Sequence, residues 1–333
     1  MQRHPVTFSS FGTVGYDSFE ELANVCQTLE ELDFAGFYAS DHLCGFGGMP
    51  PETPLMEAWT VLAGLAPLTR RLRLGVLVSG VTYRHPPMLA KIAATIDVIS
   101  RGRVVLGLGA AWWPDDHKAY GFPFPRLRER QERLEEAIEI IHGLWTQDRF
   151  TYSGKHYQVT DAALAPKPVQ KPRPPILIAA VGDRGLDLTA RRAQMWASVS
   201  TTGFAQTCIQ RITDRCRAYG RDPGEITFSQ LFTEFLPTDD ARQTRTLLEE
   251  RSRRLESADP QRVAIQARNA LEGESSEERV LGSVLAGDPD EMRAQIQRHV
   301  DIGITHIIIM FRPPFNRTLV ERFRRDVMSA FID

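Results

Sequence analysis

The fold is decided by the stretch SRGRVVLGLGAAWW at residues 100–113. Its apolar residues 104–108 form a run of strand length, and small residues with two tryptophans follow directly. Residues 88–100, entered at Pro86-Pro87, have a helical pattern before this strand, and residues 126–145 have one after it. A strand between two helices of this kind is typical of an α/β fold.

The same alternation of short apolar runs and longer helical patterns extends along the chain in both directions. Strands are predicted at residues 6–10, 36–40, 74–79, 104–108, 176–179, 195–199, 226–236 and 305–310. Helices are predicted at residues 18–33, 57–66, 88–100, 126–145, 186–193, 204–219 and 319–331, with one more opening at 288–291. Eight strands alternating with helices predict an α/β fold, a single closed (β/α)8 TIM barrel over residues 1–333. A doubly wound open sheet is the structural alternative.

Two regions depart from this rhythm. Residues 150–175, after the fourth helix, are predicted to be an insertion made of a β-hairpin that turns at Ser153-Gly154 and an extended proline-rich segment. Residues 238–282, after the seventh strand, are charged and form a variable region, predicted as helix plus an exposed loop around 273–276. Asp288-Pro289-Asp290-Glu291 then has the pattern of a capping box that opens a helix.

Composition excludes several classes of protein. The chain has 333 residues, a formal net charge of −2, 42% hydrophobic residues and 25% charged residues. These values exclude a disordered chain, and no run approaches the roughly 18 apolar residues of a membrane span. The balanced charge argues against a nucleic-acid partner. Only five of the 40 basic residues are lysines, a bias that we interpret as GC-rich codon usage.

The four cysteines lack metal-binding or redox spacing, and residues 1–5 lead directly into a strand without an apolar segment. We therefore expect a cytoplasmic protein with reduced thiols. The histidines show no H-x-x-x-H spacing, so no metal site is predicted.

In a barrel of this type the chemistry lies at the C-terminal ends of the strands. Asp41-His42 follows the second strand, where the histidine can act as a general acid or base. The structural alternative is a capping aspartate beside a hydrogen-bonded loop histidine. After the fourth strand, Gly107 and Gly109 superficially match the dinucleotide fingerprint. The third glycine is missing and Pro114-Asp115-Asp116 interrupts any immediate helix, so Rossmann-type binding is not predicted.

Small residues follow the fifth strand at 179–185, where helix-entry N–H groups can bind an anion such as phosphate. The alternative is an ordinary loop with Asp183 as the helix N-cap. After the eighth strand, Phe311 lines either the pocket or the core, and His306 within that strand is expected to be a core residue.

An ordered set of motifs resembles the bacterial luciferase-like flavin and deazaflavin oxidoreductases, and most closely the branch that depends on coenzyme F420. The resemblance is dense from about Gly36 to Trp196 and weaker at 285–311. The motifs are YASDHL at 38–43, YRHP at 83–86, SRGRVVLGLGAAW at 100–112, HKAYGFPFP at 117–125, PKPVQ at 166–170 and ILIAAVG at 176–182.

This resemblance implies a cofactor ring above the C-terminal strand ends, backed by a non-prolyl cis peptide at Leu77-Val78 or one bond later. It implies that His42 is the catalytic proton donor or acceptor. The residues it implies for cofactor binding are Asp41, Leu77, Val78, Ser79, Ala110, Ala111, Ala180, Val181, Gly182 and Asp183. The substrate pocket is expected to involve Phe11, Phe46, Trp112, Trp113 and Phe311.

One position departs from the family's sugar-phosphate dehydrogenases, which carry a catalytic glutamate where this chain has Trp112. An apolar substrate is therefore expected. The predicted function is hydride transfer from reduced F420 to a C=C or C=N bond of an organic metabolite. The alternatives are an FMN-dependent monooxygenase and a non-catalytic flavin-binding or scaffold barrel. The resemblance also implies a homodimer.

Overall fold

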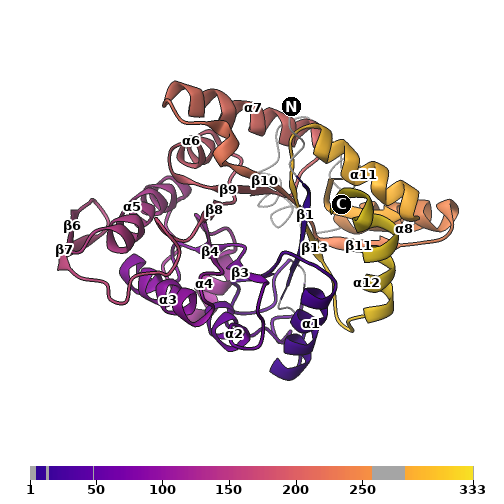
Figure 1. Cartoon of the computed structure of the whole chain (residues 1–333), viewed down its shortest axis with the longest axis horizontal. Helices are drawn as coiled ribbons and strands as arrows, with labels where there is room; N and C mark the ends of the chain where they lie inside the picture. Colours follow the sequence, from indigo (N-terminus) through magenta and orange to yellow (C-terminus); the bar gives the residue numbers. More distant parts are fainter. Residues whose placement is uncertain (1–4, 13–14, 48, 257–281, 333) are drawn as a thin grey trace.

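The closed barrel predicted from the sequence is confirmed. The computed structural model describes residues 5–12, 15–47, 49–256 and 282–332. Its barrel strands are β1 (Thr7–Phe11), β2 (Gly36–Ala39), β3 (Arg73–Val76), β4 (Ser79–Gly80), β5 (Val104–Gly109), β8 (Ile176–Ile178), β9 (Met195–Ser198), β10 (Thr227–Phe232) and β13 (His306–Met310). They pair in parallel in the order β3-β2-β1-β13-β10-β9-β8-β5-β4, and a further pairing of β3 with β5 closes the ring (Figure 1).

Helices surround this ring of strands (Figure 1). They are α1 (Phe19–Glu31), α2 (Ala58–Leu65), α3 (Pro86–Ile99), α4 (Pro114–Tyr120), α5 (Leu127–Thr146), α6 (Asp183–Arg192), α7 (Thr202–Ala218), α8 (Ala241–Glu256), α11 (Pro289–Asp301), α12 (Arg317–Phe323) and α13 (Ser329–Ile332), with a short 3-10 helix η1 (Pro223–Glu225) and a π-helix η2 (Arg324–Met328). The capping box predicted at the start of α11 is confirmed, because Asp288 and Glu291 each accept a hydrogen bond from the other's backbone N–H.

The third barrel strand, predicted as one run over residues 74–79, is divided into β3 and β4. The cis peptide expected there lies at Leu77-Val78. The glycines of β5 make room for this bulge. A Cβ built on Gly107 would lie 1.9 Å from the carbonyl oxygen of Val76, and one on Gly109 would lie 2.7 Å from a methyl carbon of Val78. Side chains in these two places would displace the bulge.

Apolar side chains fill the inside of the barrel. They are Phe11, Tyr38, Val105, Leu177, Met195, Ala197, Leu231, Ile308 and Met310, with Leu77 and Val78 packed against them. His306 is also buried, with Nε2 2.8 Å from Ser9 Oγ and Nδ1 2.9 Å from Ser229 Oγ. The expectation that His306 is a core residue is therefore confirmed.

The insertion at residues 150–175 contains the predicted antiparallel hairpin, β6 (Phe150–Ser153) and β7 (Gln158–Ala162). Buried or half-buried carboxylates on neighbouring helices hold both parts of the insertion. Glu136 of α5 accepts hydrogen bonds from three backbone N–H groups of the hairpin turn. Asp97 of α3 accepts hydrogen bonds from the backbone N–H groups of Val169 and Gln170 in the proline-rich segment.

The seventh strand, predicted over residues 226–236, is also divided. β10 stays in the barrel, whereas β11 (Glu234–Pro237) turns away and pairs in parallel with β12 (Val284–Gly287) in a separate sheet. The backbone N–H of Thr233 donates to the carbonyl of Ser283 at this branch point. β12 was not predicted, and the loop expected around 273–276 lies outside the described residues.

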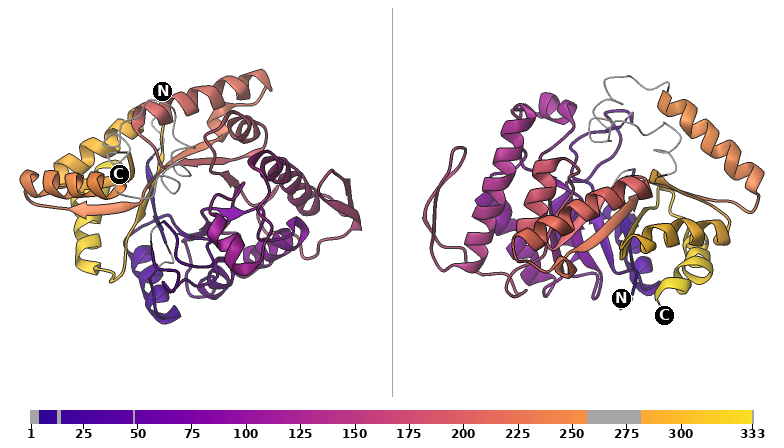
Figure 2. Two further views of the ribbon diagram at one scale, coloured as in Figure 1. Left: turned by 180° about the vertical axis from the view of Figure 1, so that it is seen from behind. Right: turned by 90° about the horizontal axis from the view of Figure 1, so that it is seen from above.

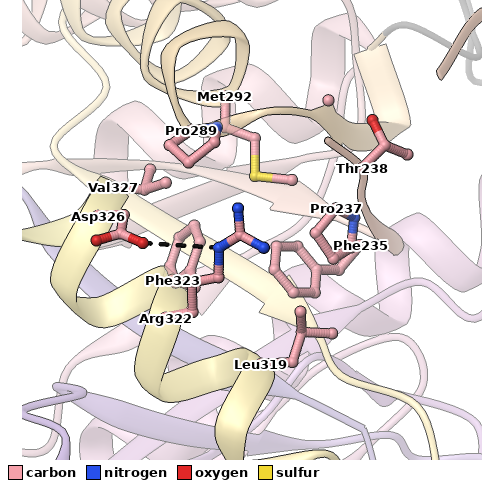
Figure 3. Close-up of a pocket in the computed structure, with 11 residues that line it drawn as sticks. Phe235, Pro237, Thr238, Pro289, Met292, Leu319, Arg322, Phe323, Asp326 and Val327 are labelled. Carbon is pink, nitrogen blue, oxygen red and sulfur yellow. Dashed lines mark ion pairs between the residues drawn. The ribbon is translucent and has the colours of Figure 1, made fainter. Parts of the chain in front are cut away.

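The side sheet of β11 and β12 packs on α11 and α12. Phe235 and Phe323 meet edge to face at 5.3 Å, and Met292 lies beside them in a small pocket (Figure 3). Arg322 and Asp326 form an ion pair at its edge. Figures 1 and 2 show α8 next to this sheet and the β6–β7 hairpin on the opposite side of the barrel.

Arginine side chains cap the carbonyl ends of several helices. Arg103 donates to the carbonyls of Ala66 and Leu72 beyond α2 and of Ser100 at the end of α3. Arg221 donates in the same way to the carbonyls of Ala190 and Ala193 at the end of α6. The last carbonyls of a helix have no partner within the helix, so these guanidinium groups supply the missing donors.

Candidate active site

The loops that follow β2, β4 and β5 meet at the C-terminal mouth of the barrel, and helix α4 joins them. The expectation that Pro114-Asp115-Asp116 interrupts a helix was wrong, because Pro114 occupies the first position of α4. Proline is favoured there because the N–H it lacks has no partner in a helix, and acidic residues are favoured in the same turn. The rejection of a Rossmann fingerprint still holds, since the third glycine is absent.

Asp116 is fully buried and accepts hydrogen bonds from two other loops. Its Oδ2 lies 2.7 Å from Nδ1 of His42 and 2.8 Å from the hydroxyl of Tyr83. Its Oδ1 accepts from the backbone N–H groups of Leu43 and Cys44 and from the Cys44 thiol, each at 3.1 Å. One carboxylate therefore ties α4 to the loops after β2 and β4.

This network keeps Asp116 ionised. Burial alone would raise the pKa of Asp116, but hydrogen bonds from His42, Cys44 and Tyr83 lower it to about 2. The effect on the donors is the opposite. Burial and the neighbouring Asp116 charge raise the pKa of the Cys44 thiol to about 11 and raise the pKa of Tyr83. The thiol and the phenol stay protonated and serve as donors.

His42 contacts two aromatic side chains. Phe46 stacks on its ring, with centroids 3.7 Å apart and planes 18° apart. Trp112 meets the His42 ring edge to face at 5.5 Å, and it meets Trp113 at 5.1 Å. The structure thus brings together His42 and three of the five residues predicted for the substrate pocket.

Asp41, beside His42 in the chain, belongs to a second polar group. Its carboxylate is buried and forms a two-point ion pair with Arg84, at 2.6 and 2.9 Å. The same guanidinium also binds Glu57, the residue before α2. Burial lowers the pKa of Arg84, but the charges of Asp41 and Glu57 outweigh this effect and raise the pKa above its usual value, so the guanidinium stays charged.

His117, the residue after Asp116, fixes α4 to the loop after β4. Its Nδ1 lies 2.8 Å from the carbonyl oxygen of Trp113, and its Nε2 lies 2.6 Å from the hydroxyl of Thr82. A carbonyl only accepts, so Nδ1 carries the proton and Nε2 accepts from Thr82. Burial lowers the pKa of His117 and favours this neutral form.

Two alanines follow β5 at the edge of the mouth. Ala111 has a positive φ of 59°, which costs an L-residue with a side chain roughly 1–2 kcal/mol. The carbonyl of Ala110 accepts a hydrogen bond from Arg130 of α5 at 2.9 Å. These contacts keep a strip of small residues next to Trp112.

An anion site was predicted in the loop after β8, and it stays a prediction. Ala180 is held by a hydrogen bond from the Trp196 indole to its carbonyl, at 2.8 Å. Gly182 is the N-cap of α6, which has no side-chain cap, and a Cβ on Gly182 would meet nothing within 4 Å. The alternative with Asp183 as N-cap was wrong, because Asp183 is the first helical residue and its carboxylate pairs with Arg211 and Arg215.

Comparison with known proteins identifies the family of the chain. The model of the family described as luciferase-like monooxygenase matches residues 3–306. The chain belongs to the luciferase-like monooxygenase family. The expected membership of this family, and with it the class of oxidoreductase enzymes, is therefore confirmed.

Individual relatives extend this finding. An F420-dependent glucose-6-phosphate dehydrogenase of Microbacterium testaceum is 31% identical over 303 residues, which cover 86% of this chain and 86% of that protein. The F420-dependent tetrahydromethanopterin reductase of Methanopyrus kandleri has the same fold, with a TM-score of 0.78 and 20% identity over 98% of this chain and 100% of that chain. A monooxygenase of Streptomyces bottropensis matches with a TM-score of 0.74 and 24% identity, over 97% and 98%.

The two remaining residues predicted for the substrate pocket lie in different parts of the core. Phe11 lies inside the barrel. Phe311 packs instead among Phe34, Phe235 and Phe323 in the outer core, and its role in a substrate pocket stays a prediction. Within the described ranges, no helix is long and apolar enough to cross a membrane, and no three ligand-type side chains form a metal site.

Sequence reasoning missed Asp116, which is the centre of the site. A signal was present, because a proline followed by two acidic residues is typical of a first helical turn. The sequence could not show that this turn reaches the loops after β2 and β4, more than 70 and 30 residues away along the chain.

Proposed function

We propose that this luciferase-like protein uses coenzyme F420 and transfers hydride from its reduced form to a C=C or C=N bond of an organic metabolite. The Microbacterium testaceum relative supports this cofactor, because it is an F420-dependent glucose-6-phosphate dehydrogenase. The observation that carries the proposal is the position of His42, which lies at the barrel mouth with Nδ1 fixed on Asp116 and its ring in contact with Trp112 after β5.

The residues present fit a flat, phosphate-bearing cofactor. The strip of Ala110 and Ala111 offers a small-residue edge for a ring. The open N-terminus of α6 at Gly182 offers backbone N–H groups for a phosphate. The Asp183 charge beside that helix end is balanced by two arginines, which lowers its repulsion of an anion. The deazaflavin, when bound, supplies the hydride.

The chain's own side chains orient the substrate and handle one proton. His42 is the group that exchanges this proton, because an imidazole ring has nitrogens that can both donate and accept. Phe46 stacks on the His42 ring and Trp112 packs edge to face against it, so both limit the orientations of the ring. Trp112 stands where the family's sugar-phosphate dehydrogenases carry a glutamate, which favours an apolar substrate over a sugar phosphate.

The family match also supports a second candidate, an FMN-dependent monooxygenase. The matched family is described as luciferase-like monooxygenase, and the monooxygenase of Streptomyces bottropensis shares the fold. Reduced flavin activates O₂, whereas a deazaflavin does not readily do so because carbon replaces nitrogen at the hydride position. The identity of the bound cofactor therefore separates the two activities.

The experiment titrates the purified protein with F420 and, separately, with FMN, and measures binding by absorbance and fluorescence. Tight binding of F420 with negligible binding of FMN supports hydride transfer. The opposite preference favours the monooxygenase, and binding of neither favours a scaffold barrel. We also propose a homodimer, which sedimentation equilibrium of the same sample tests.

A further inference from the structure

We propose that Asp116 is a positioning residue that holds His42 in the tautomer protonated on Nδ1, so that Nε2 is the ring atom that exchanges the proton with the substrate. The identity of that substrate rests on the proposed function. The tautomer itself does not, because it follows from the hydrogen bonds within the chain.

The two oxygens of Asp116 have separate partners. Oδ1 receives two backbone N–H groups, from Leu43 and Cys44, together with the Cys44 thiol. Oδ2 receives His42 Nδ1 at 2.7 Å and the Tyr83 hydroxyl at 2.8 Å. Asp116 has no exposed surface, so water does not replace any of these partners.

The chemistry of an ionised carboxylate then determines the tautomer. A carboxylate has acceptor sites only, so each of its partners must donate. A neutral imidazole has a single N–H. Since His42 donates that N–H from Nδ1 to Asp116, the lone pair is on Nε2. When the ring is protonated, Nε2 carries the second proton and the Asp116 charge stabilises it.

This arrangement accounts for the proton and the electron pairs of the proposed reaction. One atom of the substrate's double bond receives the hydride, and the other atom receives the proton from Nε2 of the protonated ring. The Nε2–H bond breaks and its electron pair stays on the imidazole, which becomes neutral. The Nδ1–H bond to Asp116 is kept throughout, so the ring does not rotate.

Replacing the carboxylate by an amide of the same shape should invert the tautomer. The amide has one acceptor oxygen and one donor NH₂. The backbone N–H groups of Leu43 and Cys44 cannot change into acceptors, so in Asp116→Asn the oxygen must face them. The NH₂ then faces His42, whose Nδ1 must accept, and the proton of the neutral ring moves to Nε2.

The test is NMR of the ring nitrogens in ¹⁵N-histidine-labelled protein at pH 8, without cofactor, with the His42 signals identified by their loss in His42→Gln. We expect an Nδ1–H ring in the wild type and an Nε2–H ring in Asp116→Asn. His117 serves as the internal control, because its Nδ1–H bond to Trp113 should persist in both proteins. An Nε2–H ring in the wild type, or an unchanged ring in a folded Asp116→Asn protein, overturns the proposal.

A second variant and a kinetic readout complete the test. Tyr83→Phe removes one donor but keeps the carboxylate, so His42 should stay protonated on Nδ1; an inverted ring there would contradict the proposal. Asp116→Asn should lower kcat about 100-fold with little change in KM. Because the amide has no charge to stabilise the protonated ring, the pH profile of kcat should move to lower pH. Wild-type protein with the Nδ1–H ring but without binding of either cofactor would refute the proposed function alone.

Discussion

Asp116 and Asp183 each lie in the first turn of a helix that follows a barrel strand, α4 after β5 and α6 after β8. Asp116 is fully buried and accepts five hydrogen bonds, from the loops after β2 and β4. The side chain of Asp183 is 68% exposed and pairs with Arg211 and Arg215 of α7.

The two aspartates occupy equivalent positions in their βα units but differ in burial. Burial, and not position, therefore determines how much each charge contributes to the stability of the fold. An exposed ion pair is weakened by water and salt, and typically contributes about 0–1 kcal/mol. A buried carboxylate leaves its donors unpaired when it is removed, which is far more costly. On one side of the mouth, the buried Asp116 therefore holds the loops together. On the other side, Asp183 is exposed to solvent and contributes little to stability.

The largest effect is expected on turnover from His42→Ala, which removes the proton-exchanging group beside Asp116. We expect kcat to fall by about 10²–10⁴-fold, measured with whichever cofactor the titration identifies. His156→Ala is the matched control, because His156 binds Glu132 at the hairpin insertion. Unchanged turnover in His42→Ala would make His42 a structural residue.

The comparison itself is tested by Asp116→Ala and Asp183→Ala. Removal of the buried carboxylate should lower the free energy of unfolding by about 3–5 kcal/mol, and removal of the exposed one by at most about 1 kcal/mol. Urea unfolding measures both values. Equal losses would show that the two aspartates do not differ in the way their burial indicates.

Two arginines, one paired with the buried Asp41 and one with the exposed Asp183, extend the comparison at a smaller scale. Arg84, with a side chain 13% exposed, holds the buried Asp41, so Arg84→Met should cost about 1.5–3 kcal/mol. Arg211, 41% exposed, holds Asp183, so Arg211→Met should change the stability by less than about 0.5 kcal/mol. Adding salt should reduce only the second effect, which the same urea titrations at two ionic strengths would show.

A separate test of the buried carboxylate is the dependence of stability on acidic pH. The pKa of Asp116 is about 2 in the folded protein and about 3.9 in an unfolded chain. Its stabilisation is thus fully present above about pH 4 and is lost as the pH falls towards 2. The gap in unfolding free energy between wild type and Asp116→Asn should narrow over this range, and a constant gap would contradict the ionised state.

The sequence predicts the barrel well because strand length and helical period are local properties. It fails where a strand leaves the barrel, since nothing in residues 226–236 shows that β11 pairs with β12, about 50 residues further on. It also fails at α4, where Pro114 was interpreted as a break although proline is favoured at a helix start. The cis peptide at Leu77-Val78 was predicted from family resemblance and not from composition.

The candidate site was predicted in part, because only some of its residues are marked by local strand patterns. His42, Phe46 and Trp112 follow strand ends, and the strand pattern places them together at one mouth. Asp116 acts through bonds to loops that are remote in the chain, and such pairings depend on the folded shape of the loops. Sequence reasoning thus found the residues that face the mouth and missed the one that organises them.

The helix-capping arginines have a consequence for any attempt to re-engineer this chain with lysine. Arg103 and Arg221 each reach several carbonyls at once through a planar fork of donors, which a single ammonium group cannot reproduce. The arginine-rich composition that looks like codon bias therefore contains positions where the guanidinium shape is required. Arginine-to-lysine replacements should therefore leave Arg103 and Arg221 unchanged.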